Sequence, residues 1–290
     1  MDRPARGHGT SRILILGATS KVGRFLRAIW GDTPPNGCEL IYQTRHVVKT
    51  RGQVHYDYGD DPFVFGKLDT VISLWGNTSF DLKALEDNTK LALDAIRIAR
   101  VCGADRVFHA SSIAAYGPRS HPLSEQDTLA PANAYGKAKA AMEAAVQDAT
   151  PPKSCCLRLG SIAGAESLAK AFAANAPLTL DRFADSKGPS RSYIAPSDLA
   201  DILIQLATLP LEALPPALNI GASDPVQMAQ LLRAAGADFA WRPAPETALQ
   251  NAVLDTSALQ QLISMPPRSA DPDWIAQDWL RWKGPADDLV

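Results

Sequence analysis

Short apolar runs alternate with longer amphipathic stretches over the first two-thirds of the chain. Residues 13–16 form an unbroken apolar run, typical of a strand buried on both faces, and residues 22–30 follow with apolar positions at helical spacing. The same alternation predicts strands at 39–44, 71–74, 106–110 and 154–159, and helices at 81–102 and 135–149. Fully apolar strands separated by helices predict an α/β fold, in which a doubly wound parallel sheet is covered on both faces.

The regular alternation of predicted strands and helices ends at about residue 160. Helices are predicted at 166–174 and 197–209, on either side of a stretch rich in proline, arginine and serine. A short apolar run at 218–220 and a helical, proline-punctuated tail from residue 224 complete the chain. The pattern divides the chain into a flexible leader, a first domain, and a small C-terminal α/β lobe interleaved with the end of the sheet, at residues 1–11, 12–160 and 161–290.

Composition narrows the choice of partners. Hydrophobic residues make up 46% and charged residues 21% of the chain, and the formal net charge is −2, so no basic surplus exists to neutralise a phosphate backbone. No apolar stretch approaches the roughly 20 residues that span a bilayer. We therefore expect a small-molecule ligand, and neither nucleic acid nor a membrane as a partner.

The cysteines and histidines suggest no metal chemistry. Cys38, Cys102, Cys155 and Cys156 lack the CxxC and Cys/His spacings of metal sites, and the last two lie in an apolar run typical of a strand. Neither a metal site nor a disulfide framework is predicted, and we expect a reducing, cytoplasmic location. His109 ends an apolar run, and we expect this side chain to pack in the core rather than to act at a functional site.

A turn that contains glycine, Gly17-Ala-Thr-Ser-Lys-Val-Gly23, joins the first predicted strand to the first predicted helix. Glycines at such a junction permit a tight turn and let backbone N–H groups approach a pyrophosphate, whose charge the helix N-terminus stabilises. A plain turn is the alternative, but the position at the first strand of an α/β chain favours a phosphate site. Ligands of open parallel sheets bind beyond the carboxyl ends of the strands, so we expect chemistry in the loops there.

Tyr135 and Lys139 lie four residues apart at the start of an alanine-rich helix. This spacing places both side chains on one helical face, with the cationic nitrogen near the phenol oxygen. A proton-transfer pair and a chance Tyr-x-x-x-Lys both fit the spacing, so other motifs have to decide between them.

Several motifs in a fixed order make the chain resemble the extended short-chain dehydrogenase/reductase family, which includes sugar-nucleotide epimerases and dehydratases. In "DRVFHASSIAAYG" Ser112 stands four residues before Tyr116-Gly117, at the position of the hydroxylic residue in the family's Ser/Thr…Tyr-x-x-x-Lys order. Asn88 matches the asparagine of the preceding helix. The segments "LRL", "SRSYIAPSDLADIL" and "ALNIGAS" echo later signatures, with a weaker echo in "VLDTSALQQL", so the resemblance covers roughly residues 12–222.

The resemblance implies a Rossmann fold, with a first domain that binds a dinucleotide and a lobe that binds substrate. It implies that Tyr135 is the acid/base, that Ser112 hydrogen-bonds the same substrate oxygen, and that Lys139 holds the ribose and favours the tyrosine anion. The expected cofactor contacts are Gly17, Thr19, Ser20, Lys21, Val22, Gly23, Arg45, Asp57, Tyr58, Leu74, Trp75, Gly76 and Asn88, together with Tyr135 and Lys139.

Two features bear on cofactor binding: the middle residue of the glycine turn and the charge after the second predicted strand. Ser20 replaces the middle glycine of the family's loop, which puts a Cβ near the path of the pyrophosphate and offers a hydroxyl to a phosphate oxygen. The second predicted strand ends at Arg45, and Lys49 and Arg51 follow with no Asp or Glu before Tyr56. An acidic residue there favours NAD, whereas an arginine accommodates the 2′-phosphate of NADP. We expect NADP in preference to NAD; a solvated basic turn is the alternative.

Substrate contacts are expected at Trp75, Asn77, Ile113, Tyr116, Ser161, Arg191 and Tyr193. Arg191 and Tyr193 align with the family's Arg-x-(Tyr/Phe) segment, whose arginine reaches a nucleotide-sugar phosphate. From Ser161 the chain reads Ser-Ile-Ala-Gly, where the epimerases have an Asn-x-Tyr-Gly-Pro loop, which argues against a standard sugar nucleotide. Ile113 and Ala114 replace the Asp-Glu pair of the dehydratases, which disfavours dehydration.

Two functions of different class fit these residues. The first is an NAD(P)-dependent oxidoreductase or epimerase, acting at a hydroxyl or carbonyl carbon of a sugar nucleotide or a small carbonyl compound. The second is a catalytically silent NAD(P)-binding sensor or interaction protein that keeps the fold. The intact set of Ser112, Tyr135 and Lys139 favours the enzyme. The resemblance also implies a homodimer paired through residues 81–102 and 135–149.

Overall fold

A seven-stranded sheet runs through the centre of the computed structural model, which describes residues 10–46, 52–78, 81–173 and 177–289. The strand order is β11-β6-β5-β4-β1-β2-β3, and all neighbours are parallel. The strands are β1 (Ser11–Leu16), β2 (Cys38–Thr44), β3 (Gln53–His55), β4 (Thr70–Ser73), β5 (Arg106–Ser112), β6 (Lys153–Leu159) and β11 (Ala217–Ile220). This confirms the predicted α/β class. Lys49, Arg51 and residues 1–9 of the predicted leader lie outside the described residues.

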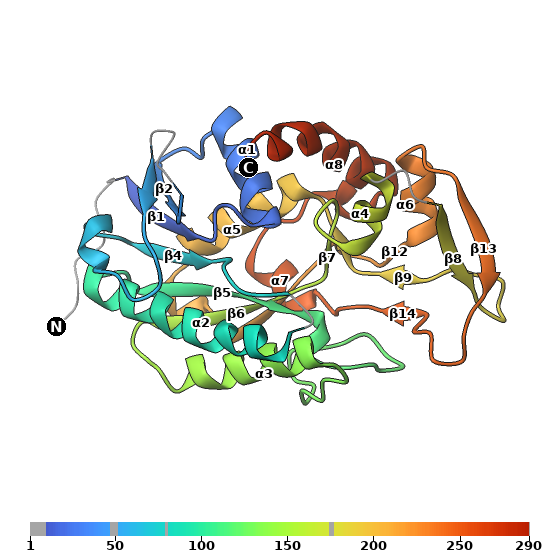
Figure 1. Cartoon of the computed structure of the whole chain (residues 1–290), viewed down its shortest axis with the longest axis horizontal. Coiled ribbons are helices and arrows are strands. Elements are labelled where there is room, and N and C mark those ends of the chain that lie inside the picture. Colours follow the sequence, from blue (N-terminus) through green and yellow to red (C-terminus); the bar gives the residue numbers. More distant parts are fainter. Residues whose placement is uncertain (1–9, 47–51, 79–80, 174–176, 290) are drawn as a thin grey trace.

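Helices cover both faces of this sheet (Figure 1). One face carries α1 (Lys21–Asp32), α5 (Pro196–Thr208) and α8 (Pro272–Asp287), and the other carries α2 (Leu82–Cys102) and α3 (Ala134–Gln147). The connections change direction between β1 and β4, so the crevice of a doubly wound sheet is expected at the carboxyl ends of these two strands. None of the described helices combines the length and the apolar character needed to cross a membrane.

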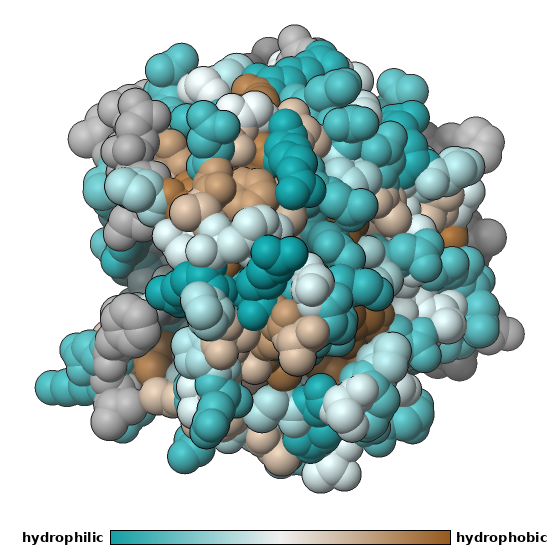
Figure 2. Space-filling model, turned by 90° about the vertical axis from the view of Figure 1, so that its right-hand side faces the viewer, coloured by the Kyte–Doolittle hydropathy of each residue, from teal (hydrophilic) through white to brown (hydrophobic). Residues whose placement is uncertain are grey.

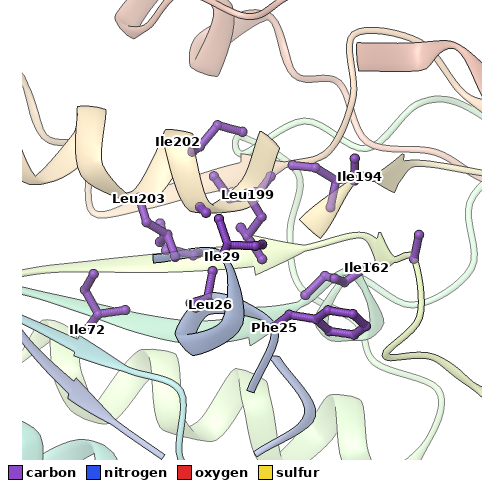
Figure 3. Packing of buried hydrophobic residues seen from close by; sticks show 14 of the residues in the cluster. Phe25, Leu26, Ile29, Ile72, Ile162, Ile194, Leu199, Ile202 and Leu203 are labelled. Atoms are coloured by element: carbon purple, nitrogen blue, oxygen red, sulfur yellow. The ribbon is translucent and has the colours of Figure 1, made fainter. Parts of the chain in front are cut away.

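The apolar strand pattern fills two separate cores. In β1, Ile13 and Ile15 point to the cluster formed with α1, α5 and α8, while Leu14 and Leu16 point to the cluster formed with α2. This alternation follows from the two-residue period of a strand. Figure 3 shows part of the first cluster, with Leu26 and Ile29 of α1 facing Leu199 and Leu203 of α5. Burial on both faces explains the continuous apolar run of β1.

Local capping sets the ends of the helices that border the candidate site. Ser20 precedes α1 and its side chain accepts a hydrogen bond from the Gly23 amide, and Asn133 accepts in the same way from Gly136 at the start of α3. Gly103 ends α2 in the left-handed conformation, with φ of 78°. These short-range signals place α1, α2 and α3 close to the residues that the pattern predicted.

The C-terminal lobe contains more strand than the sequence pattern indicates. Three small sheets join distant segments: β7 with β10, β9 with β12 and β14, and β8 with β13. Their bounds are β7 (Ser161–Ile162), β8 (Leu178–Arg182), β9 (Ser190–Arg191), β10 (Tyr193–Ile194), β12 (Val226–Gln227), β13 (Phe239–Pro243) and β14 (Asn251–Ala252), with helices α4 (Ser167–Ala173), α6 (Met228–Ala234) and α7 (Ser257–Leu262). The prediction of a helical tail from residue 224 is therefore wrong in part, because β12, β13 and β14 form only against distant partners. Hydrophilic side chains cover most of this side of the molecule, and apolar ones show in recesses (Figure 2).

His109 of β5 is buried in the core, where its Nε2 lies 3.3 Å from the Ser154 hydroxyl. Burial, with the Lys139 charge as a smaller contribution, lowers the pKa of His109 from 6.5 to about 3. In the unfolded chain the imidazole takes up a proton as the pH falls below 6.5, whereas in the folded chain it stays neutral. Acid therefore favours unfolding through this residue, and the stability present above pH 6.5 is lost as the pH falls towards the folded pKa.

Replacing His109 with glutamine is expected to flatten this acid sensitivity. Between about pH 7 and about pH 4.5 the native protein should lose about 2–3 kcal/mol more unfolding free energy than His109→Gln. Urea unfolding monitored by tryptophan fluorescence at each pH measures the difference. Equal losses in the two proteins would show that His109 does not carry this linkage.

Candidate functional site

A cavity of about 540 Å³ opens at the carboxyl edge of the sheet, beside the point where the connections change direction. Its walls come from the loops after β1, β2, β3 and β4 and from α2. The lining residues are Gly17, Thr19, Ser20, Gln43, Arg45, Asp57, Tyr58, Trp75, Gly76, Asn77, Asp87, Lys90 and Leu91. Loops from four parallel strands thus meet around one cavity.

The glycine turn closes one wall of this cavity. Gly17 has a φ of 77°, and a Cβ there would lie 2.5 Å from the Trp75 backbone nitrogen. A Cβ on Gly23 would lie 2.4 Å from the Gly17 carbonyl oxygen. Both positions therefore need glycine, one for the turn and one for the close packing of α1 against it. Ser20, at the middle position, caps α1 through its hydroxyl, and Lys21 and Val22 form the first two residues of that helix.

A second group of residues stands at the ends of β2 and β3. Arg45 is exposed on the cavity wall, and Asp57 and Tyr58 line the same end. Gln43, two residues before Arg45, is buried; its Oε1 accepts from the Gly17 amide at 2.9 Å and its Nε2 donates to the Tyr56 carbonyl at 2.7 Å. Gln43 thus joins the glycine turn to the loop after β3.

Ser112, Tyr135 and Lys139 come together at the ends of β5 and α3. Ser112 is the last residue of β5, its hydroxyl accepts from the Ala114 amide at 3.2 Å, and it hydrogen-bonds the Tyr135 phenol. The Lys139 Nζ lies 5.9 Å from the centroid of the Tyr135 ring and donates to the Ala110 carbonyl at 2.7 Å. One hydroxyl, one phenol and one ammonium group therefore converge from two elements that are distant in sequence.

Burial dominates the electrostatics of this trio. It raises the pKa of Tyr135, which the hydrogen bond from Ser112 partly offsets. It lowers the pKa of Lys139 to about 8, while Cys156 and Glu143 act in the opposite direction. At neutral pH the phenol therefore carries its proton and the amine remains largely charged, which is the state of a proton donor beside a cation.

Gly76 and Asn88 connect the cavity to the trio. Gly76 has a φ of 151°, and a Cβ there would lie 2.6 Å from the Asn88 Oδ1 and 3.5 Å from the Lys139 Nζ. Asn88 is buried and holds the backbone of Asn77 through its Oδ1 and its Nδ2, at 3.2 and 3.1 Å. The loop after β4 thus brings the cavity wall to within contact distance of Lys139. Leu74 begins this loop and donates its amide to Leu16 of β1.

The residues expected to contact substrate are more scattered. Tyr116 is fully buried, and its hydroxyl donates to the Asn219 Oδ1 at 2.7 Å and accepts from Arg158. Arg191 donates through Nη1 to the carbonyls of Ser190 and Gln250, and through Nη2 to that of Leu249. The structure thus gives Tyr116 a packing position and uses most of the Arg191 guanidinium to hold a neighbouring segment.

The other expected substrate contacts differ in their exposure. Tyr193 of β10 is buried in the core, whereas Ser161 of β7 and Ile113, in the 3₁₀ turn after β5, are half-buried. Trp75 and Asn77 line the cavity, and the Trp75 indole nitrogen is buried with no hydrogen-bond partner among the described residues. The same part of the chain holds no cluster of three or more side chains suited to a metal ion.

These features fit a dinucleotide. Positions 17 and 23 leave no room for a side chain, and Gly17, Thr19 and Ser20 of this turn line the cavity at the start of α1, where a pyrophosphate would approach. The buried indole N–H of Trp75 offers an unused donor in the cavity wall. Arg45 supplies a cation in the cavity wall, and the Lys139 ammonium lies next to Gly76 of the same wall.

Several residues of the cavity wall were not singled out from the sequence. Gln43 lies on the same side of β2 as Arg45, which the two-residue strand period could have indicated. Asp87, Lys90 and Leu91 line the cavity from α2, at a spacing of three and four residues that places them on one helical face. Such periodicity identifies a shared face but does not say that the face borders a cavity.

A protein-family model and the solved structures give independent comparisons. The model of the NAD dependent epimerase/dehydratase family matches residues 61–221. No curated protein matches the sequence. The match by the family model spans the segment that holds Asn88, Ser112, Tyr135 and Lys139.

Solved structures of sugar-nucleotide enzymes superimpose on nearly the whole chain. The UDP-N-acetylglucosamine 4-epimerase from Bacillus cereus is 20% identical with a TM-score of 0.77, over 94% of this chain and 100% of that one. The UDP-Glc/GlcNAc 4-epimerase from the human pathogen Campylobacter jejuni is 22% identical with a TM-score of 0.74, over 94% and 99%. MoeE5, solved in complex with UDP-glucuronic acid and NAD, is 17% identical with a TM-score of 0.74, over the same shares. At these identities the likeness establishes a shared fold.

Proposed function

Because the chain belongs to the NAD dependent epimerase/dehydratase family, we propose that it is an NAD(P)-dependent enzyme that transfers hydride at a hydroxyl- or carbonyl-bearing carbon. The observation that carries this proposal is the convergence of Ser112, Tyr135 and Lys139 at the edge of a cavity with a glycine turn in its wall. A protein that only binds the cofactor, without catalysing a reaction, would not need a hydrogen-bonded phenol beside a buried amine.

Different residues at the cavity would bind different parts of the dinucleotide. The amides of the turn from Gly17 to Gly23 would bind the pyrophosphate, Asp57 and Tyr58 would contact the adenosine, and Lys139 would hold the nicotinamide ribose. When bound, the nicotinamide supplies or accepts the hydride. The protein's own task is to fix the geometry and to move one proton.

The proton moves through Tyr135. In carbonyl reduction the substrate oxygen gains charge as its carbon accepts hydride, and the Tyr135 phenol donates its proton to that oxygen. The Ser112 hydroxyl, which hydrogen-bonds Tyr135, stabilises the developing charge on the same oxygen. The Lys139 ammonium stabilises the tyrosinate that remains. Oxidation of an alcohol runs the same steps in reverse, and an oxidation followed by reduction on the other face gives epimerisation.

The substrate belongs to one of two classes. The solved structures named above include enzymes that act on UDP-sugars, which favours a sugar nucleotide. The commitment of Arg191 to the carbonyls of residues 249 and 250 favours a small carbonyl compound, since this guanidinium has few donors left for a phosphate. Ile113 and Ala114 carry no acid or base next to Ser112, so elimination of water is not proposed.

Cofactor titration followed by substrate screening tests the proposal. Quenching of tryptophan fluorescence by NADPH and NADH would measure both affinities, and absorbance of the reduced cofactor would then report turnover of UDP-sugars and of small aldehydes and ketones. The proposal predicts oxidation of the cofactor by a compound of one class. Tight cofactor binding with no turnover across both classes would instead identify a cofactor-binding sensor.

Replacing Arg45 with alanine tests the preference for NADP. We expect the Kd for NADPH to rise by about 10–100-fold, because hydrogen bonds to a charged phosphate contribute about 1.5–3 kcal/mol. The Kd for NADH should stay within about twofold, since NADH lacks the 2′-phosphate. Arg242→Ala, which removes an exposed arginine paired with Asp181, is the control. Equal changes for the two cofactors would contradict the assignment of Arg45.

A further inference from the structure

One stripe of α3 contacts three consecutive residues of β5. Tyr135, Lys139 and Glu143 follow one another at a spacing of four, so they share a face of the helix. Their partners are the last three residues of β5: Tyr135 meets Ser112, Lys139 donates to the Ala110 carbonyl, and Glu143 accepts from the Ser111 hydroxyl. The first two contacts belong to the proposed site. The third lies one helical turn beyond it.

Glu143 is buried in a network that joins three elements. Its carboxylate accepts from the Arg158 guanidinium at 2.8 Å to Nη2 and at 3.1 and 3.2 Å to Nε. The side chains of Arg158 and Glu143 are only 8% and 6% exposed, so the pair is shielded from water. Arg158 lies on β6 directly opposite Ser111 of β5. Glu143 therefore fastens α3 to two neighbouring strands at the level of Ser111.

This fastening fixes the axial position of α3. A helix held at one point can rotate or slide, whereas contacts at two successive turns define both its rotation and its height on the sheet. Lys139 and Glu143 provide these two contacts, at Ala110 and Ser111. Tyr135 lies one turn closer to the start of α3. Its distance from Ser112 is therefore set by the contacts of Lys139 and Glu143 with β5.

We propose that Glu143 is a positioning residue, which holds α3 on β5 so that the Tyr135 phenol meets Ser112 and which balances the charge of Lys139. This inference rests on the function proposed above. Among the described residues, Glu143 neither lines the cavity nor hydrogen-bonds Tyr135, so we infer that it acts through the placement and the charge of the residues on its stripe.

The effect of Glu143 on the charge of Lys139 can be measured, because few other charged groups among the described residues surround this amine. His109 of β5, Cys156 of β6, and Tyr135 and Glu143 of α3 face the amine. Burial keeps His109 neutral, and it raises the pKa of Cys156 well above that of a free thiol, so that side chain is neutral too. Glu143 is then the group whose negative charge favours the ammonium form, and its loss should lower the pKa of Lys139 below about 8.

Two variants separate placement from charge. Glu143→Gln keeps the shape and removes the charge, whereas Ser111→Ala removes one hydrogen bond and keeps the ion pair with Arg158. The control is Glu212→Gln, at an exposed glutamate in the turn after α5. The pKa of Lys139 is measured in the free protein by ¹³C NMR of labelled lysines, with the signal assigned through Lys139→Met. The kcat and the KM for NADPH are measured with the UDP-sugar, aldehyde or ketone that the screen identifies, and circular dichroism checks the folded fraction.

In Glu143→Gln we expect the pKa of Lys139 to fall by about half a unit or more and kcat to fall by about tenfold, with the KM for NADPH within about twofold. In Ser111→Ala we expect a fall in kcat of about threefold and an unchanged pKa of Lys139. An unchanged pKa of Lys139 in folded Glu143→Gln would overturn the charge role, and an unchanged kcat in Ser111→Ala would overturn the placement role. The NMR titration needs no substrate, so its result stands even if no turnover is found.

Discussion

Replacing Tyr135 with phenylalanine is expected to lower kcat by about 10²–10⁴-fold while leaving the Kd for NADPH within about twofold. The change removes one hydroxyl, which is the group placed to move the proton, and it leaves the ring that packs beside Lys139. The cavity wall is formed by other residues, so cofactor binding should persist. Steady-state turnover and fluorescence titration with NADPH, on the same preparation, measure the two quantities.

Tyr42→Phe is the matched control for this result. Tyr42 lies on β2 with Arg27 over its ring at 5.9 Å, so removal of its hydroxyl should leave kcat unaltered. Full turnover in Tyr135→Phe would refute the assigned acid/base. A parallel loss of kcat and of NADPH affinity would show that the variant has damaged the cavity and that Tyr135 contributes to binding.

Replacing Arg158 with methionine is expected to lower the free energy of unfolding by about 3–5 kcal/mol. The guanidinium neutralises the buried Glu143 carboxylate through three hydrogen bonds and also donates to the hydroxyl of the fully buried Tyr116. Methionine has a similar volume but no charge, so the buried carboxylate would lose the cation that it hydrogen-bonds. Urea unfolding at neutral pH measures the loss.

A double variant separates this cause from a simple packing defect. Arg158→Met combined with Glu143→Leu removes both charges, so most of the lost stability should return. Arg242→Met removes an arginine from the exposed pair with Asp181 and should change the unfolding free energy by less than about 1 kcal/mol. A double variant no more stable than Arg158→Met alone would show that shape, not charge, governs this part of the core.

The central strands of the main sheet could be predicted because β1, β4, β5 and β6 are largely buried on both faces. Parallel strands without a solvent face appear as continuous apolar runs, so residues 13–16 identified β1 without any knowledge of its partners. The helices on its faces carry their own end signals: Ser20 caps α1 and Gly103 ends α2. In these elements the local pattern and the tertiary packing favour the same structure.

The lobe could not be predicted in the same way. β8 and β13 are half-exposed strands that pair with each other across about sixty residues, and neither has more than three apolar residues in a row. β3 is three residues long and half-exposed. Short edge strands of this kind form because a partner presents unpaired backbone groups, and a single sequence does not reveal that partner.

The candidate site was predictable in its residue types but not in all its contacts. The order of Ser112, Tyr135 and Lys139 indicated the trio that the structure brings together. The motif ends at Lys139, so it gave no reason to consider Glu143, although the same spacing of four continues to it. The motif around Arg191 indicated a phosphate as the partner of this guanidinium, whereas in the structure it donates to backbone carbonyls.

A crystal structure of the protein with bound NADPH would test the central claim most directly. The account predicts that the pyrophosphate lies on the amides between Gly17 and Gly23, and that the nicotinamide ring reaches past Gly76, with its reactive carbon facing the Tyr135 hydroxyl. A dinucleotide bound elsewhere, or a nicotinamide turned away from Ser112, Tyr135 and Lys139, would contradict the assignment of these three residues to hydride-transfer chemistry.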